Sequence, residues 1–224
     1  MNEIRWATFD CFGTLVDWRH GIATGAELLF PGQGTGLLEI YNTHEPVVQR
    51  EKPELRYREV MAESLRRTAA EAGLALNADD TAILGQTIPY WPVFPDTTAA
   101  LTALREDGWR LALLTNCDRD IIGETQRRLG VPIDAVITAE DAGAYKPDYS
   151  HFLRFQQSFG AGPENWVHIA QSYFHDITPA HELNIRRVWI NRLGQTDDPG
   201  IADAVLPDLT QLVDTVNRVH EFAR

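Results

Sequence analysis

The chain has 224 residues and a mass of 25.2 kDa, which is enough for one large domain or for a domain with a modest insertion. Its 32 acidic and 20 basic residues give a formal net charge of −12, which disfavours nucleic acid and anionic membrane surfaces as partners. Apolar residues make up 44% of the chain, as in ordinary folded proteins, and no apolar stretch approaches the roughly 18 residues of a membrane-spanning helix.

The beginning of the chain and its cysteines indicate a compartment. The first ten residues lack the basic start and the apolar run of a secretion signal. Cys11 and Cys117 are too few for a disulfide framework and do not form the CxxC spacing of a zinc site. The sequence therefore predicts a cytoplasmic protein without a zinc site.

Strand and helix signals alternate along most of the chain. Short apolar runs typical of buried strands occupy residues 4–9, 110–114, 135–138, 166–170 and 187–190. Helical patterns occupy residues 97–107, 119–129, 149–159, 177–183 and 209–222. This alternation predicts an α/β fold: a Rossmann-like parallel sheet flanked by crossover helices.

Residues 18–93 interrupt the alternation. They contain no convincing strand, but residues 37–51, 54–72 and 79–88 have helical spacing. The proline-rich segment 89–95 ends the last of these helices, because a proline disfavours helix in the residue before it. We therefore expect a core domain formed by residues 1–17 and 94–224, with an all-helical insertion at residues 18–93.

Charged and polar residues stand at the ends of four predicted strands. Asp10 follows the first strand, Thr115 and Asn116 end the second, Lys146 follows the third, and Asp176 follows the fourth. Ligands of open parallel sheets bind beyond the carboxyl ends of the strands, so these side chains are expected to converge there. A carboxylate on a glycine-containing turn is a candidate nucleophile, and an ammonium group beside it offsets negative charge.

The order and spacing of these segments resemble the haloacid dehalogenase superfamily across essentially the whole chain. Residues 9–17 resemble its first motif, residues 115–116 its second, residues 146–147 its third, and Asp176 its fourth. The insertion resembles the helical cap of that family, which closes over the core and excludes water.

Residue 12 favours one reaction within this superfamily. Its phosphatases generally carry an aspartate two positions after the nucleophile, which protonates the leaving group. Here that position is Phe12, which cannot transfer a proton, whereas a halide leaves without one. The fourth motif has Gln171 and Asp176 in place of an acidic pair, which disfavours a magnesium site. The resemblance is therefore closest to the type II 2-haloacid dehalogenases, which need no cofactor.

This resemblance implies a mechanism in which Asp10 displaces halide from a small 2-haloalkanoate and forms an aspartyl ester, which water then hydrolyses. Lys146 would hold Asp10 ionised and pair with Asp176, which helps to position the water. Hydrogen bonds to the carboxylates would come from three further residues: Thr14, Thr115 and Asn116.

The substrate pocket departs from the family pattern. Near Asn42 the chain lacks the arginine that such dehalogenases use for the halide, and His175 replaces a tryptophan. An anionic substrate approaching a chain of net charge −12 needs local cations, for which Lys146, a cap arginine and His175 are the candidates. The predicted substrate-contacting residues are Cys11, Phe12, Asn42, Trp91, Ser172, Tyr173 and His175.

Two alternatives remain open at this point. The first is a hydrolase of the same superfamily that acts on another carbon–heteroatom bond or on a phosphate ester. The second is a non-catalytic protein that binds small anions on the same fold. A homodimer, common among similar proteins, is compatible with either function.

Overall fold

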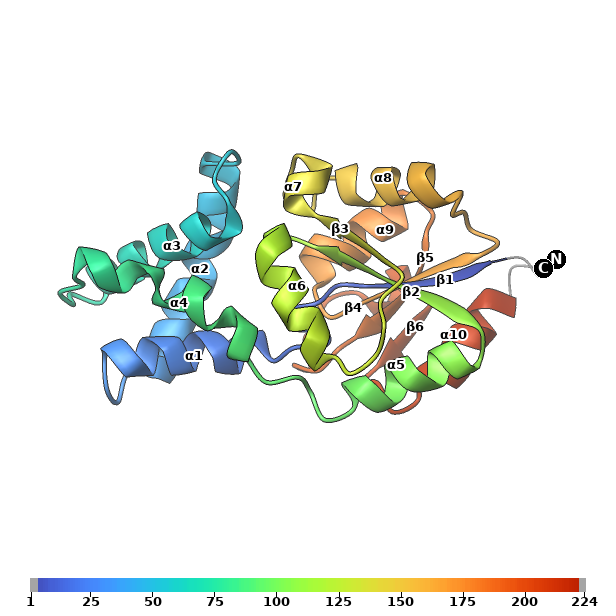
Figure 1. Cartoon of the computed structure of the whole chain (residues 1–224), viewed down its shortest axis with the longest axis horizontal. Helices are drawn as coiled ribbons and strands as arrows, with labels where there is room; N and C mark the ends of the chain where they lie inside the picture. Colours follow the sequence, from blue (N-terminus) through green and yellow to red (C-terminus); the bar gives the residue numbers. More distant parts are fainter. Residues whose placement is uncertain (1–3, 222–224) are drawn as a thin grey trace. The chain divides into compact units, whose positions relative to one another are not determined.

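The structure, a computed structural model, describes residues 4–221. The chain forms two compact units. Within the described residues, the first unit contains residues 4–16, 93–115 and 126–221, and the second contains residues 17–92 and 116–125. Figure 1 labels the helices and strands of both units.

The first unit is built on a parallel sheet of six strands in the order β3-β2-β1-β4-β5-β6. The α/β architecture expected from the sequence is confirmed, because all neighbouring strands are parallel and helices connect them. The strands are β1 (Arg5–Phe9), β2 (Trp109–Thr115), β3 (Ala135–Thr138), β4 (Trp166–Ala170), β5 (Arg186–Ile190) and β6 (Ala204–Leu206). The sequence did not indicate β6, which is a three-residue edge strand.

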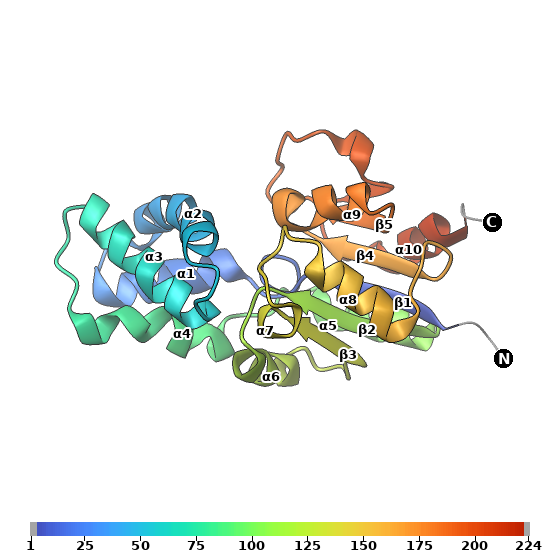
Figure 2. The same ribbon diagram turned by 90° about the horizontal axis from the view of Figure 1, so that it is seen from above.

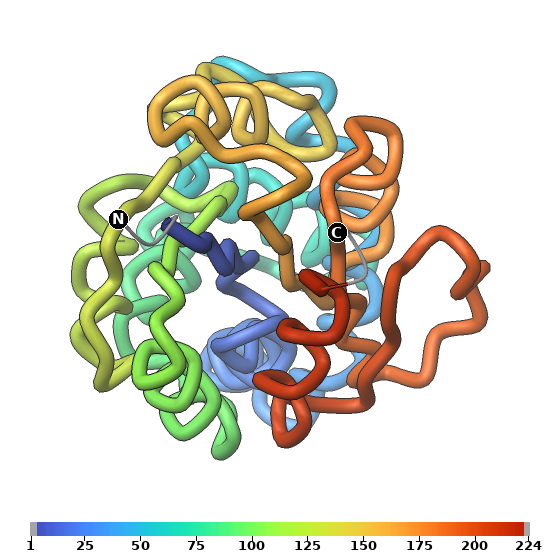
Figure 3. The backbone as a smooth tube through the Cα atoms, turned by 90° about the vertical axis from the view of Figure 1, so that its right-hand side faces the viewer, coloured from blue at the N-terminus to red at the C-terminus, as the bar shows by residue number. Residues whose placement is uncertain are grey.

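Strand β1 lies between β2 and β4 in the middle of the sheet. Ala7 is the register partner of Leu111 on one side and of Val167 on the other, and all three side chains are fully buried. A strand covered on both faces has an almost continuous apolar sequence, which is why β1 was recognisable. Figure 3 shows β1 in dark blue between the green segment of β2 and the orange segment of β4.

Helices cover both faces of this sheet (Figure 1). On one face, Trp6 of β1 packs edge-on against Phe155 at 5.2 Å between ring centroids, within a buried apolar cluster that includes Trp166. The helices on this face are α7 (Ala139–Ala142), α8 (Ser150–Phe159) and α9 (Thr178–Glu182), and those on the opposite face are α5 (Thr97–Glu106) and α10 (Leu212–Glu221).

The segment before α9 differs from the predicted helix 177–183. A single π-helical turn, η3 (Tyr173–Ile177), precedes α9, so the helical region begins earlier than the sequence pattern indicated. Ser172 caps this turn by accepting a hydrogen bond from the backbone N–H of His175. The turn places the buried Asp176 directly after the end of β4.

The second unit is helical, as Figure 2 shows. Its helices are α1 (Trp18–Leu29), α2 (Gly34–Glu51), α3 (Tyr57–Glu71) and α4 (Ile83–Thr87), with short 3₁₀ turns η1 (Ala78–Ala82) and η2 (Ile88–Tyr90) around α4. The sequence analysis identified α2, α3 and the α4 region but no helix at α1. Within α1, a Cβ atom on Gly21 would lie 2.1 Å from the Trp91 ring, so this packing requires glycine. Glycine is a poor helix former, which is why the sequence pattern did not indicate α1.

Residues 116–125 group with this helical unit, whereas the sequence-based division assigned them to the core. They include the first part of α6 (Arg119–Arg128). The reason is local: the Asp118 carboxylate accepts hydrogen bonds from the backbone N–H of Tyr57 at 2.8 Å and from Arg58 Nε at 3.0 Å. Asp118 therefore satisfies donors at the start of α3.

Among the described residues 4–221, no helix is both long enough and apolar enough to cross a lipid bilayer.

Candidate active site

Asp10 stands directly after β1 on a tight turn and is 7% exposed. Its backbone N–H donates to the carbonyl of Ile169 at 3.1 Å, which joins the turn to β4. Gly13 adopts φ +97°, and a Cβ atom there would lie 3.1 Å from the Gln171 side chain. A residue without a side chain is therefore required at position 13 to hold Asp10 at the end of the strand.

The Lys146 ammonium group lies between two carboxylates. Its Nζ atom donates to Asp10 Oδ1 at 3.0 Å, to Asp176 Oδ1 at 2.6 Å and to the carbonyl of Leu114 at 2.8 Å. An ammonium group has three N–H bonds, and these three acceptors match them. Lys146 is 1% exposed, so the arrangement is a desolvated network of three charges.

The environment shifts the pKa values of these three groups differently. Burial raises the pKa of Asp10, although Lys146 and Thr14 oppose this. Burial acts on Asp176 in the same sense, but the Lys146 charge and the hydrogen bond from His168 outweigh it and lower the pKa of Asp176 to about 2. Burial lowers the pKa of Lys146, and the two carboxylates more than reverse this. Asp176 is thus ionised at neutral pH, and the pKa of Asp10 lies above that of Asp176.

Thr14 fixes the second oxygen of Asp10. Its hydroxyl donates to Asp10 Oδ2 at 2.8 Å and accepts from the backbone N–H of Gln171 at 2.9 Å. Because the Gln171 amide occupies a lone pair of the hydroxyl, the Thr14 proton is directed at the carboxylate. Thr14 thus holds the second oxygen of Asp10 in a fixed direction.

The two oxygens of Asp176 have different surroundings. Oδ1 accepts from Lys146 and lies 3.0 Å from Nε2 of His168. Oδ2 is buried and has no hydrogen-bond partner among the described residues. A buried, ionised oxygen of this kind is a strong acceptor for the proton of a polar ligand.

His168 was missed by the sequence analysis. It lies inside β4, is fully buried, and bonds to Asp176. The available signal was a histidine within the apolar run 166–170, because buried polar side chains nearly always have a partner.

The second predicted motif lies at the end of β2. Thr115 is buried, and its carbonyl lies 3.1 Å from Nε2 of the buried His151. Burial lowers the pKa of His151 to about 4, so the neutral ring donates to this carbonyl. Asn116 is the first residue of the segment that groups with the helical unit.

The predicted pocket residues of the first unit have several environments. Cys11 is fully buried, and burial raises the pKa of its thiol; Phe12 is half-buried. Tyr173 packs on Trp189 and donates its hydroxyl to the carbonyl of Asp198 at 3.0 Å, so its polar end is used within the fold.

His175 does not carry the positive charge suggested for it. Its Nδ1 lies 2.9 Å from Ser172 Oγ, and burial lowers the pKa of His175 to about 4. With this pKa the ring is uncharged at pH 7, and the cation that contacts Asp10 and Asp176 is Lys146.

Two predicted pocket residues, Asn42 and Trp91, belong to the helical unit. In the amide orientation that satisfies both of its groups, Asn42 donates to the carbonyl of Leu38 at 3.3 Å and accepts from Arg19 Nη1 at 3.0 Å. Trp91 is 4% exposed and donates to Thr87 Oγ1 at 3.2 Å. Trp91 therefore contributes to the packing of this unit, whereas Asn42 stands beside a cation.

The donor set is poorly suited to the magnesium ion used by phosphatases of this superfamily. Lys146 Nζ bonds to both carboxylates, so an ammonium group supplies the positive charge between them. Among the described residues, no group of three or more histidine, cysteine, aspartate or glutamate side chains is arranged to hold a metal ion. Two carboxylates that already share a lysine ammonium group are a poor set of ligands for a divalent cation.

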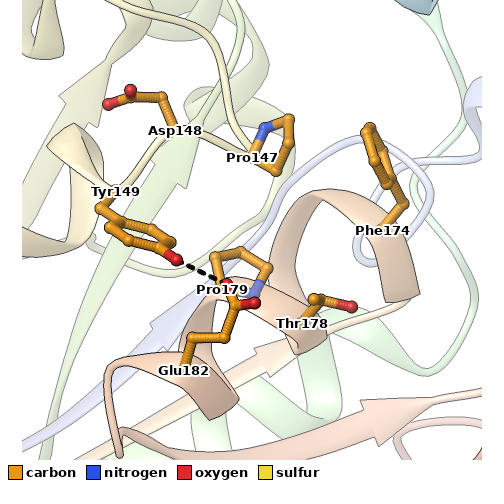
Figure 4. Close-up of a pocket in the computed structure, with 7 residues that line it drawn as sticks. All are labelled: Pro147, Asp148, Tyr149, Phe174, Thr178, Pro179 and Glu182. Carbon is orange, nitrogen blue, oxygen red and sulfur yellow. Dashed lines mark hydrogen bonds between the residues drawn. The ribbon is translucent and has the colours of Figure 1, made fainter.

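An open pocket of about 440 Å³ adjoins the segment that follows Lys146, and Figure 4 shows the residues that line it. Tyr149 donates to Glu182 at 2.6 Å across it, and Phe174 forms part of its wall. Asp10, Lys146 and Asp176 are not among its lining residues, so it is distinct from the charged site.

The chain is similar to known haloacid dehalogenases. The chain is 28% identical over 217 residues to haloacetate dehalogenase H-2 of Moraxella sp. (strain B), which covers 88% of this chain and 93% of that protein. It is also 28% identical over 207 residues to (S)-2-haloacid dehalogenase H-109 of Pseudomonas putida, covering 88% and 90% of the two chains.

Solved structures share the fold. The L-2-haloacid dehalogenase of Xanthobacter autotrophicus with covalently bound chloropropionic acid superposes with a TM-score of 0.82 at 20% identity, covering 96% of this chain and 99% of that one. L-2-haloacid dehalogenase RSc1362 superposes with a TM-score of 0.85 at 24% identity, covering 96% and 100%. A model of the haloacid dehalogenase-like hydrolases matches residues 4–184, most of the chain, and the protein therefore belongs to this hydrolase family.

Proposed function

We propose that this hydrolase is a 2-haloacid dehalogenase, which converts a small 2-haloalkanoate and water into a 2-hydroxyalkanoate, halide and a proton. The observation that carries the proposal is Asp10, held by Lys146 and Thr14 at the end of β1, with Phe12 at the position of the phosphatases' acid. The names of relatives that span most of this chain support the same substrate class.

In the first step, a lone pair of the Asp10 carboxylate attacks the carbon that bears the halogen. The carbon–oxygen bond forms as the carbon–halogen bond breaks, the halide leaves with the bonding electrons, and the carbon is inverted. No proton is transferred in this step, so the absence of an acid at Phe12 does not slow it. Thr14 and Lys146 fix the direction of the carboxylate, which lowers the entropic cost of reaching the attacking geometry.

In the second step, water attacks the carbonyl carbon of the aspartyl ester. Asp176 Oδ2 accepts one proton of the water, and the acyl carbon–oxygen bond of the tetrahedral intermediate then breaks. The departing alkoxide takes this proton from Asp176 and leaves as the hydroxy acid, and Asp10 regains its carboxylate by releasing the second proton of the water. The Lys146 ammonium, within 3.0 Å of Asp10 Oδ1, stabilises the negative charge that develops on the carbonyl oxygen.

Several finer assignments remain part of this proposal. Hydrogen bonds from Thr115 and Asn116 belong to it, and so do the core role of residues 1–17 with 94–224 and the cap role of residues 18–93. Turnover without a cofactor, a homodimer and a cytoplasmic location complete it. The proposed substrate contacts are Cys11, Phe12, Asn42, Trp91, Ser172, Tyr173 and His175.

The proposal is tested with protein treated with a chelator. It is incubated separately with chloroacetate, fluoroacetate, each enantiomer of 2-chloropropionate and 4-nitrophenyl phosphate, while halide and phosphate are measured. We expect halide from at least one haloacid and, in a single turnover in H₂¹⁸O, one ¹⁸O atom in Asp10. Asp10→Asn is expected to release no halide. Magnesium-dependent phosphate release without halide would overturn the proposal.

A further inference from the structure

His168 is joined to a chain of buried polar groups that extends away from the charged site. Trp166 Nε1 donates to Thr8 Oγ1 at 2.7 Å, and Thr8 Oγ1 lies 2.8 Å from His168 Nδ1. His168 Nε2 lies 3.0 Å from Asp176 Oδ1. The side chains of Thr8, His168 and Asp176 are fully buried, and Trp166 is 1% exposed.

The sheet register produces this chain of contacts. Thr8 of β1 and His168 of β4 are register partners in a parallel pair, so their side chains lie on the same face of the sheet. The Phe152 ring of α8 stands edge-on to the His168 ring at 5.0 Å and 81°, which restricts its rotation. The imidazole is thus held by contacts from two strands and a helix.

The donors and acceptors of the chain select one form of His168. The Thr8 hydroxyl has one proton, and Trp166 already donates to its oxygen. Because Asp176 is ionised, Nε2 of His168 carries a proton and donates it to Asp176. In the neutral ring, Nδ1 then carries no proton and accepts the hydrogen bond of the Thr8 hydroxyl. In the opposite tautomer, Nε2 would face the Asp176 carboxylate without a proton, and two acceptors would oppose each other.

We infer that Thr8 and His168 position Asp176 for hydrolysis of the ester intermediate, an inference that rests on the function proposed above. Before the reaction, Lys146 is shared between two carboxylates. Forming the ester removes the negative charge of Asp10, so the ion pair that helps to fix Lys146, and through it Asp176, is weakened. The His168 contact does not depend on Asp10 and keeps Oδ1 occupied, so that Oδ2 remains the oxygen that accepts the water proton.

The decisive variants change Thr8, which lies one residue beyond His168 in the chain of contacts. Thr8→Val keeps the shape of the side chain but removes the hydroxyl, and Thr8→Ser keeps the hydroxyl as the matched control. In a single turnover with 2-chloropropionate, we expect Thr8→Val to form the Asp10 ester within about two-fold of the wild-type rate and to hydrolyse it about ten-fold more slowly. The ester adduct should then accumulate on Asp10 in the mass spectrum, whereas Thr8→Ser should behave like the wild type.

His168→Leu gives a second measurement in case Thr8→Val does not fold. Its ester hydrolysis should slow by at least as much as in Thr8→Val, with the adduct again accumulating. A general loss of structure would slow ester formation and hydrolysis alike, so a change confined to hydrolysis separates positioning from folding. Equal losses in both steps for both variants would overturn the inference.

A spectroscopic measurement is independent of turnover. In ¹⁵N spectra of wild-type protein labelled at histidine, His168 should show a protonated Nε2 and an unprotonated Nδ1, and Thr8→Val should shift the Nδ1 resonance. The opposite tautomer would overturn the inference.

The possible failures are distinguishable. A wild-type protein that releases no halide rejects the dehalogenase proposal, and the inference falls with it. A wild-type protein that turns over, combined with Thr8→Val and His168→Leu proteins that hydrolyse the ester at the wild-type rate, rejects only the positioning role.

Discussion

The fold buries the Lys146 ammonium group, and ion pairs with two carboxylates compensate the free energy of its desolvation. Transfer of an ammonium group from water costs several kcal/mol, and ion pairs in a medium of low dielectric constant recover it only when the geometry is good. The contacts of 3.0 Å to Asp10 and 2.6 Å to Asp176 provide that geometry. Lys146 is therefore a structural requirement of this site, and the proposed mechanism gives it a catalytic role as well.

Replacing this cation tests both roles. Lys146→Met retains the length of the side chain but leaves two carboxylates buried without their shared cation, and we expect kcat to fall by at least a thousand-fold. The free energy of unfolding should fall by about 3 kcal/mol or more, because an uncompensated buried charge remains. Halide release and urea denaturation measure the two effects.

The other lysine of the chain provides the control. Lys52 belongs to the helical unit, and its side chain is 39% exposed. Lys52→Met should leave kcat unchanged and alter the free energy of unfolding by less than about 1 kcal/mol. Equal activity losses in the two variants would contradict the role assigned to Lys146.

The sequence predicted the charged residues of the site better than the residues that support them. Asp10, Lys146 and Asp176 stand where strands end, and their chemistry is visible in the sequence. Thr8 and His168 lie within apolar runs, and nothing in the sequence shows that they are register partners. Nor does a histidine beside Asp176 reveal that burial lowers the pKa of His175 to about 4.

Among the elements, α1 shows how packing overrides helix propensity. The ring of Trp91 occupies the space beside Gly21, where a Cβ atom would lie 2.1 Å away. Gly25, one turn later, is similarly close to Leu84, at 2.5 Å. Glycine lowers helix propensity, so a pattern-based analysis misses a helix whose glycines are explained only by side chains distant in sequence. The edge strand β6 was missed because it is short and Val205 is exposed.

Two alanine substitutions in the helical unit separate these effects. Gly21→Ala should lower the free energy of unfolding by about 1–3 kcal/mol, because its methyl group collides with Trp91. At Gly36 on α2, no atom beyond its chain neighbours and the nearby helix backbone lies within 4 Å of the added carbon. Gly36→Ala should therefore raise the free energy of unfolding by about 1 kcal/mol through helix propensity. Urea denaturation followed by circular dichroism measures both changes, and a stabilising Gly21→Ala would contradict the packing described for α1.

Helix α2 also carries a buried carboxyl group, Glu45, which is 8% exposed. Burial raises the pKa of Glu45 to about 7, although a hydrogen bond from Tyr57 opposes this. Tyr57 in turn accepts from Trp18 Nε1 at 3.3 Å. The unfolded chain would ionise Glu45 near pH 4.5, so the folded state binds more protons between pH 4.5 and 7, and stability falls as the pH rises through this range.

Glu45→Gln removes this titration while retaining a hydrogen-bonding side chain. We expect the variant to exceed the wild type in free energy of unfolding at pH 8, by up to about 3 kcal/mol, with little difference at pH 5. Urea denaturation at the two pH values measures the change. The exposed Glu54→Gln serves as control and should show no such pH dependence. A Glu45→Gln benefit that is the same at pH 5 and pH 8 would contradict the burial argument.

For the whole molecule, the net charge of −12 opposes the approach of an anionic substrate. Salt screens this long-range repulsion, since the Debye length falls from roughly 30 Å at 0.01 M to 8 Å at 0.15 M ionic strength. We expect kcat/KM for 2-chloropropionate to rise up to a few-fold over this range. The neutral 2-chloropropionamide serves as the control substrate, and its kcat/KM, where turnover is measurable, should not change. A falling kcat/KM for the acid would indicate that local cations dominate the approach.

The central place of β1 also governs the order in which the chain can fold. Arg5 pairs with Trp109 and Trp6 with Trp166, so the strand leading to Asp10 has no neighbours until much of the chain has been synthesised. By contrast, α1 to α4 contact one another and all lie within residues 18–87, so their contacts join segments that are close in the sequence. Contacts between distant segments form slowly because long loops must close first. We therefore expect the helical insertion to fold early, as it emerges from the ribosome. The apolar strand β1 that precedes it remains unpaired for longer, and chaperones or rapid sheet assembly are needed to keep it from aggregating.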